Sequence, residues 1–157
     1  MSEWWGAALV IVVMTAATVL GRAIRNPSLR RSAEALGLTS SNVPLPQDLD
    51  LQALSCWGRF DSVSNVMSGV FEGLSCVAFD HYSNCGDSSY YQTIVAFRTT
   101  TKTVTLNSLW RASELIVETT GQWVSIYRKR ELVQGKGLDK FLRESRALLA
   151  YLDDPHM

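Results

Sequence analysis

The feature that most constrains this chain is an uninterrupted apolar stretch close to its first residue. Residues 4–21 read WWGAALVIVVMTAATVLG and carry no charge, with Glu3 before them and Arg22 after them. A helix over this stretch rises about 27 Å, close to the roughly 30 Å hydrocarbon core of a bilayer. The sequence therefore predicts a transmembrane helix over residues 4–21.

The residues that flank this stretch predict its orientation. Trp4 and Trp5 suit one membrane interface, and four arginines follow the stretch before the first acidic residue beyond it: Arg22, Arg25, Arg30 and Arg31. A cleaved secretory signal opens with basic residues, whereas this chain opens with Met-Ser-Glu. We expect an uncleaved anchor in the bacterial inner membrane, with the N-terminus outside, the arginines at the cytoplasmic interface, and the rest cytoplasmic.

Length and charge limit what the remainder can be. The chain has 157 residues, enough for one ordinary domain and an appendage. Its 15 basic and 15 acidic residues balance, so net charge gives no reason to expect a nucleic-acid partner. The three cysteines, Cys56, Cys76 and Cys85, form no disulfide framework and have no metal-ligand spacing, which fits a reducing compartment. No metal or cofactor is predicted.

Residues 22–48 are predicted to be a juxtamembrane helix and a linker. Asn26-Pro27 interrupts the chain, and Ser28 is placed to cap a short helix over residues 29–36 that Gly37 ends. Arg30 and Arg31 on this helix could face anionic headgroups, or serve only to orient the chain. Ser40 to Pro46 is typical of an extended linker, so we expect the compact domain to begin near Leu49.

Residues 49–152 have the pattern of an antiparallel sheet followed by a helix. Two hairpins are predicted, around Glu72-Gly73 and around Thr120-Gly121, with Gly69 marking a bulge or a close backbone approach. The polar stretch 81–89 is predicted to connect the first hairpin to a central strand at residues 91–97, beside which residues 103–106 could pair. The apolar spacing after Leu138 predicts a helix with one buried face, and residues 153–157 form a tail. The fold class is α+β.

One set of residues carries a resemblance to a known group of proteins. The set is Gly58, Asn65-Val66, Gly69, Gly73 and Val77-Ala78-Phe79-Asp80, followed by a loop rich in Tyr, Ser and Gly and by the strand at residues 93–97. With this G…NV..G…G…V.FD pattern, residues 49–152 resemble a family of uncharacterised bacterial single-span membrane proteins. The resemblance implies a span with a cytoplasmic domain, and implies no catalytic residues.

The strongest catalytic candidates are Asp80, His81 and Cys85. An aspartate can orient a histidine that activates a thiol, but nearness in sequence is weak evidence because such groups are usually gathered from distant positions. The structural interpretation is favoured: Asp80 caps the loop, His81 is a surface residue and Cys85 lies in a turn. A zinc site of His81, Cys85, Cys56 and Cys76 is disfavoured by the spacing.

Two further groups are candidates for contacts with partners. Aromatic residues flank the polar stretch or lie elsewhere on the predicted sheet, namely Tyr82, Tyr90, Tyr91, Trp110 and Trp123, and rings of this kind often anchor interfaces. Alternatively, these aromatic side chains cover the edge of the sheet. The run Arg128-Lys129-Arg130, with Lys136 nearby, could bind phosphate or lipid headgroups, although a short run after a strand is usually a solvated turn.

The function predicted from the sequence is not enzymatic. We expect a membrane-anchored interaction domain, an accessory subunit of a larger membrane complex whose partners are lipids and other membrane-protein subunits. The first alternative is a membrane-surface enzyme or sensor that uses the Asp80-His81-Cys85 loop. The second is a module that binds anionic lipid.

Overall fold

The computed structural model describes residues 25–40, 44–59, 61–85, 88–99, 110–112 and 114–153. Within these ranges, no helix is both long enough and apolar enough to cross a membrane. The predicted span at residues 4–21 lies outside them, as do the predicted strand at residues 103–106 and the end of the predicted tail.

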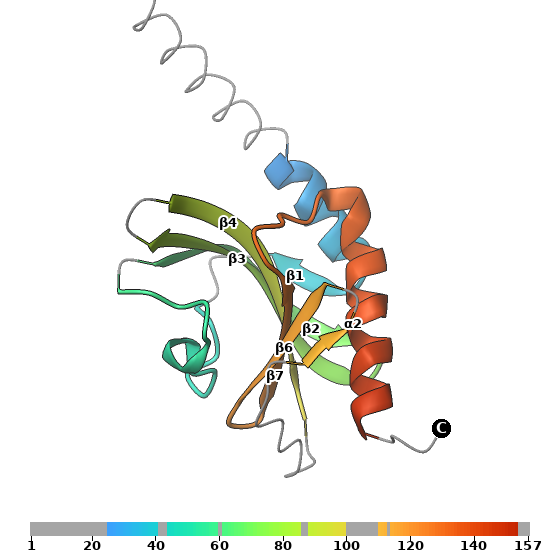
Figure 1. The fold of residues 1–157 in the computed structure, drawn as a ribbon. Helices are drawn as coiled ribbons and strands as arrows, with labels where there is room; N and C mark the ends of the chain where they lie inside the picture. The colour runs from blue at the N-terminus through green and yellow to red at the C-terminus, as the bar shows by residue number, and fades with distance from the viewer. Residues whose placement is uncertain are drawn as a thin grey trace, which may run out of the picture.

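The described chain folds into a seven-stranded antiparallel sheet in the order β1-β2-β3-β4-β7-β6-β5 (Figure 1). This confirms the α+β class and the central position of the strand predicted at residues 91–97. The strands are β1 (Leu38–Ser40), β2 (Ser62–Phe71), β3 (Leu74–Cys85), β4 (Ser88–Arg98), β5 (Trp110–Ala112), β6 (Leu115–Thr120) and β7 (Trp123–Arg128).

Both predicted hairpins form. β2 and β3 meet at a two-residue turn in which Glu72 and Gly73 both have positive φ, 46° and 82°, as the twist of a tight hairpin requires. β6 and β7 meet at Gly121. The prediction that residues 81–89 are a loop is wrong, because β3 runs on to Cys85 and β4 starts at Ser88. His81 and Ser83 are buried polar residues of β3. Their polarity is typical of a loop, but the strand continues through them into a covered part of the sheet.

One side of the sheet, called the helix face below, is covered by two helices. These are residues 25–35, called the docked helix, and α2 (Leu138–Asp153), which follows the short 3-10 helix η2 (Gly135–Gly137). Both lie on the same side of the sheet in Figure 1. They share one core with the sheet, and its members include Leu29, Ala33, Met67, Phe97, Val124, Phe141, Leu142 and Leu149. The predicted packing of the last helix on the sheet is confirmed.

The docked helix corrects the predicted start of the domain. Its Leu29 and Ala33 are 1% and 0% exposed, and Leu38 of β1 is 1% exposed in the same core. The packed domain therefore includes residues 25–40 and does not begin near Leu49. The predicted interruption at Asn26-Pro27 with a cap at Ser28 is also wrong, because both Arg25 and Asn26 are already helical. Gly37, with φ +76°, follows the helix end as predicted.

The other side of the sheet, called the loop face, is covered by residues 44–59. This segment contains only the 3-10 helix η1 (Leu51–Ala53) and turns. Its side chains pack on a second core whose buried members are Leu49, Leu54, Val77, Phe79, Ile94, Ala96, Trp123 and Tyr127. Both faces of the central strands are thus covered, and this explains why the middle of β4 is apolar on both sides.

Candidate functional site

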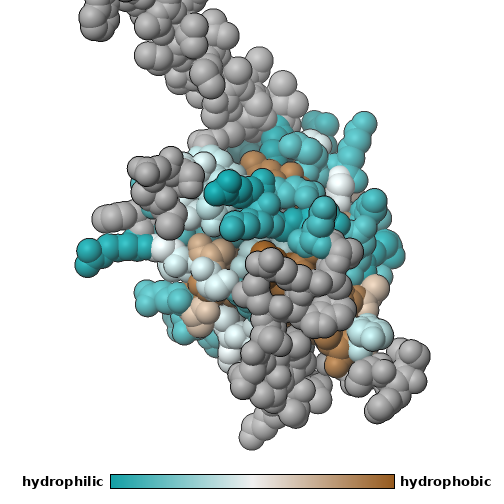
Figure 2. Space-filling view, in the orientation of Figure 1, coloured by the Kyte–Doolittle hydropathy of each residue, from teal (hydrophilic) through white to brown (hydrophobic). Residues whose placement is uncertain are grey.

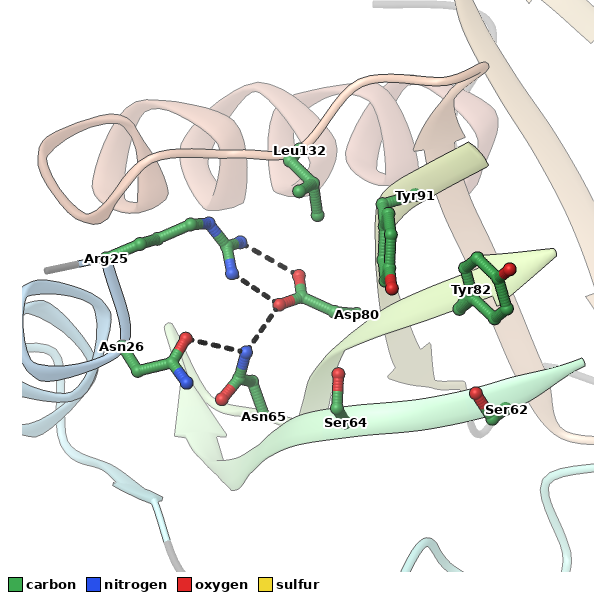
Figure 3. Close-up of a pocket in the computed structure, with 9 residues that line it drawn as sticks. All are labelled: Arg25, Asn26, Ser62, Ser64, Asn65, Asp80, Tyr82, Tyr91 and Leu132. Atoms are coloured by element: carbon green, nitrogen blue, oxygen red, sulfur yellow. Dashed lines mark hydrogen bonds and ion pairs between the residues drawn. The ribbon is translucent and has the colours of Figure 1, made fainter. Parts of the chain in front are cut away.

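The candidate site is centred on Asp80, a β3 carboxylate that is 2% exposed. Cys76 and Ala78 belong to the core of the helix face, and alternation along the strand directs Asp80 to that same face. Its Oδ1 accepts hydrogen bonds from Thr93 Oγ1 and Arg25 Nη2, both at 2.9 Å. Its Oδ2 accepts from Arg25 Nη1 at 2.5 Å and from Asn65 Nδ2 at 2.7 Å (Figure 3).

These four bonds limit the chemistry of Asp80. A carboxylate offers about four acceptor positions, so every position is used. A general base needs a free lone pair within reach of a substrate proton. Asp80 is therefore a structural group that holds its neighbours in place.

Arg25 is buried in the domain, whereas a side chain exposed at the membrane interface was predicted. Its side chain is 9% exposed, and its guanidinium forms the two-pronged ion pair with Asp80. Nη2 also donates to the carbonyl oxygen of Val133 at 2.8 Å. A guanidinium removed from water needs this kind of paired, bidentate partner, and Asp80 provides it. The contact joins the start of the docked helix to β3 and to the segment before α2.

A bulge in β2 brings Asn65 into the site. The pairing of β2 with β3 shifts between Ser64 and Met67, and Asn65 has φ +51°. Such a bulge lets consecutive side chains lie on one side of the strand, and Ser64 and Asn65 both line the helix face (Figure 3). Of the two roles predicted for Gly69, the close approach is confirmed, because a Cβ there would lie 2.7 Å from the carbonyl oxygen of Gly37.

A pocket of about 260 Å³ opens beside this cluster. Figure 3 shows its lining side chains arranged around a common space. They come from the docked helix, from β2, β3 and β4, and from the segment before α2: Arg25, Asn26, Ser62, Ser64, Asn65, Asp80, Tyr82, Tyr91 and Leu132. Most of the groups that face the space are hydroxyls or amides, and the two opposite charges are paired with each other.

His81, the next residue of β3, points to the loop face and is 0% exposed. Its Nε2 lies 2.7 Å from Asp61 Oδ2, and its ring stacks on Trp57 with centroids 4.9 Å apart. Gln92 Oε1 accepts from the backbone N–H of Arg130, so Gln92 Nε2 donates to His81 Nδ1 at 3.2 Å. This arrangement fits the neutral imidazole with its proton on Nε2. The prediction that His81 is a surface residue is wrong.

Asp61 anchors the loop face as Asp80 anchors the helix face. Burial by itself would raise its pKa, but the backbone N–H groups of Asn84 and Gly58 and the ring of His81 outweigh burial and lower the pKa below its usual value of 3.8. These donors lie at 3.0, 2.7 and 2.7 Å from the carboxylate. Asp61 therefore remains ionised at neutral pH.

The three catalytic candidates are not brought together. Asp80 and His81 lie on opposite faces of the sheet, because neighbouring strand residues point in opposite directions. Cys85 lies four residues beyond His81 on the same strand, a separation of about 13 Å at 3.3 Å per residue. Cys85 is the last residue of β3, whereas a turn was predicted. Its side chain is not among those that the structure describes.

The thiols of Cys56 and Cys76 lie in different cores. Burial raises the pKa of Cys76 to about 12 on the helix face, and burial likewise raises the pKa of Cys56 to about 11 on the loop face. Within the described ranges, no three His, Cys, Asp or Glu side chains gather as a metal site would require. Cys56 and Cys76 thus have the environment of small core side chains.

The aromatic residues that were predicted to contact partners lie in different surroundings. Tyr82 and Tyr91 lie side by side, with ring centroids 4.6 Å apart, and form one wall of the pocket. Tyr90 lies under the guanidinium of Arg130 at 5.3 Å. Trp110 begins β5, and its side chain lies outside the description. Trp123 is 3% exposed and belongs to the core of the loop face.

Two arginines of the basic run that begins with the last residue of β7 contact the domain itself. Arg128 pairs with Glu131 at 3.2 Å and with Glu144 of α2 at 2.6 Å, and its guanidinium lies over Phe141. Arg130 lies over Tyr90. These contacts tie the end of β7 to α2 and leave Arg128 a poor candidate for holding a phosphate.

Comparison of the chain with known proteins finds no matching family model, no matching curated protein and no matching solved structure.

Proposed function

We propose that this chain is a membrane-anchored, non-catalytic interaction protein, an accessory subunit of a larger complex in the bacterial inner membrane. Residues 4–21 serve as its single span. The α+β domain lies on the cytoplasmic side and docks on other subunits.

The observation that carries this proposal is the burial of Arg25. This residue follows the apolar stretch by four positions, and its guanidinium is held by Asp80 and by the carbonyl of Val133. Leu29 and Ala33 extend the same attachment into the core. A domain whose packed part begins four residues after its proposed span has a short connection to the membrane, and this limits the orientations that it can take. A docking subunit benefits from such an orientation, because partner subunits in the same membrane are oriented too.

The proposed orientation depends on the arginines around the docked helix. Arg30 and Arg31 are exposed on its surface, and Arg22 lies next to the apolar stretch. An excess of basic residues within about 15–20 positions of a span favours the cytoplasmic side. Described side chains are mostly hydrophilic over the face seen in Figure 2, as expected for a domain in contact with water.

The enzyme alternative receives no support from the geometry. It needs His81 as a base beside Cys85, whereas His81 is fully buried between Asp61, Gln92 and Trp57. Both ring nitrogens already have hydrogen-bond partners.

The test is mass spectrometry of the proteins that co-purify with the full-length chain after mild detergent extraction. One control replaces residues 4–21 with an unrelated apolar span of equal length, and the other fuses residues 1–24 to an unrelated soluble domain. We expect a fixed set of membrane subunits, in constant ratio, with the first control and their loss with the second. Recovery of only a monomer or a homodimer would contradict the proposal.

A further inference from the structure

We infer that the pocket beside Arg25 binds a small, uncharged, hydroxyl-rich group of sugar size. The pocket measures about 260 Å³, slightly below the roughly 300–1,000 Å³ usual for small-molecule sites. Its walls come from five separate parts of the chain, so its shape depends on the folded domain and not on one loop.

The charge of the pocket selects against ions. Among its lining residues only Arg25 and Asp80 are charged, and they neutralise each other through the ion pair. The acceptor positions of Asp80 are all occupied, and the two terminal nitrogens of Arg25 donate to Asp80 and Val133. Nε of Arg25 is buried without a hydrogen-bond partner, but the charge of the guanidinium is already neutralised by Asp80. An added anion or cation would therefore lose its hydration without gaining a free opposite charge.

The remaining walls provide the contacts that a sugar uses. Ser62 and Ser64 lie two residues apart on β2, and both are exposed toward the pocket. In the sheet register Ser62 pairs with Tyr82, and Tyr82 pairs with Tyr91, which places hydroxyls across three neighbouring strands. Hydroxyl side chains both donate and accept hydrogen bonds, as sugar hydroxyls do.

Aromatic and apolar surface completes the match. The paired rings of Tyr82 and Tyr91 form one wall, and Leu132 lies across the space from β2 (Figure 3). The C–H faces of a sugar ring pack on such surface while its hydroxyls meet the polar groups. A few convergent polar groups on a partly apolar wall are the usual composition of a small-molecule site.

Two sources could deliver this group, a free sugar or the uncharged headgroup of a glycolipid. The second rests on the proposed function, because Arg25 and Asn26 line the pocket only a few residues after the proposed span. If residues 4–21 span the bilayer, the pocket lies near the level of the headgroups. Binding of a free sugar does not require the membrane.

The first arm of the test titrates methyl glucoside into the full-length protein, followed by saturation-transfer NMR. The protein is held in a polyoxyethylene detergent, because sugar-based detergents would compete. We expect saturable binding and no binding of glucose 6-phosphate. Ser64→Leu fills the pocket and should weaken binding at least about tenfold, the loss expected for about one lost hydrogen bond plus steric exclusion.

Ser75→Leu is the matched control, since Ser75 is also an exposed strand serine but lies outside the pocket, opposite Val70. It should leave binding unchanged. Tyr82→Phe removes one hydroxyl while keeping the ring, and should weaken binding by a smaller factor. Equal thermal transitions of the two leucine variants show that any difference in binding does not come from unfolding.

The second arm uses nanodiscs of phosphatidylcholine with or without a monoglucosyl diacylglycerol. Binding that needs the glycolipid identifies a headgroup as the source, and binding of methyl glucoside alone identifies a free sugar. Binding of neither, equal binding to the Ser64→Leu variant, or preference for glucose 6-phosphate overturns the inference. Any of these results leaves the co-purification test unaffected, so the two proposals fail separately.

Discussion

The two faces of the sheet are covered in different ways, and β3 shows the contrast within two residues. Asp80 points to the helix face and is neutralised by the guanidinium of Arg25. His81 points to the loop face and contacts Asp61 as a neutral ring. One face is thus closed by a buried ion pair and the other by a network of hydrogen bonds.

The segments that cover the two faces of the sheet also differ in structure. On the helix face, two regular helices bury an aliphatic core, and their backbone groups bond within each helix. On the loop face, residues 44–59 have few internal bonds and depend on contacts such as Asp61 with the N–H groups of Gly58 and Asn84. We expect the loop cover to open locally more easily than the helical cover.

The largest expected effect comes from removing the two buried carboxylates one at a time. Asp80→Ala leaves the guanidinium of Arg25 buried without its partner, which should cost about 3–5 kcal/mol of stability. Asp61→Ala leaves neutral donors unsatisfied and should cost about 1–3 kcal/mol. Chemical unfolding of the full-length protein in micelles, followed by tryptophan fluorescence, measures both.

The double variant Arg25→Met with Asp80→Leu is the control for this comparison. It removes both charges, so it should recover much of the stability that Asp80→Ala loses. An equal loss of stability in Asp80→Ala and Asp61→Ala would contradict this expectation. It would show that the ion pair and the hydrogen-bond network stabilise the two faces to the same extent.

A smaller effect is expected where the docked helix meets η2. A Cβ on Gly135 would lie 2.6 Å from the carbonyl carbon of Ser28 and still closer to its Oγ, so Gly135→Ala should cost about 1–3 kcal/mol through overpacking. Gly137→Ala is its control, because that Cβ would make an ordinary contact of 3.6 Å with Val133. The same unfolding measurement applies. Equal stability of the two variants would mean that the docked helix and η2 are not tightly packed at Gly135.

The smallest effect concerns the two buried thiols. With pKa values of about 12 for Cys76 and about 11 for Cys56, each against a usual 9.0, both should react slowly with iodoacetamide at pH 8. Cys56 should react at least about tenfold faster, from its larger thiolate fraction and the easier opening of the loop cover. Mass spectrometry of single-cysteine proteins made in a Cys85→Ser background follows each rate. Faster labelling of Cys76 would reverse the expected order of the two covers.

The parts of the fold that could be predicted from the sequence are local. The turn at Glu72-Gly73 and the stripe that begins at Leu138 depend on residues within a few positions of one another, so their patterns are visible in the chain. Residues 81–89 have the polarity of a loop, but His81 and the backbone N–H of Asn84 bond to Asp61, more than 15 positions away in the sequence. Polarity indicates a loop only where no such partner exists.

The candidate site shows the same limit more strongly. Arg25 and Asp80 are 55 positions apart, and His81 and Asp61 are 20 apart. Nothing near Arg25 distinguishes it from Arg30 or Arg31, which are exposed on the same helix. Asn65 carried a weak signal, because asparagine is enriched where φ is positive, as it is at the bulge. Ser62 and Ser64 matter only because the sheet register sets them opposite Tyr82 and Asp80.

The bond from Arg25 to Val133 also determines when the domain can be completed during synthesis. The two residues are 108 positions apart, and the ribosome adds roughly 5–20 residues per second. At least about 5 seconds therefore pass between the synthesis of Arg25 and the synthesis of Val133, the last partner of its guanidinium. If residues 4–21 are the proposed span, they are available to the insertion machinery during that interval. Such a chain would have time to enter the membrane before its own C-terminal half closes the domain around Arg25.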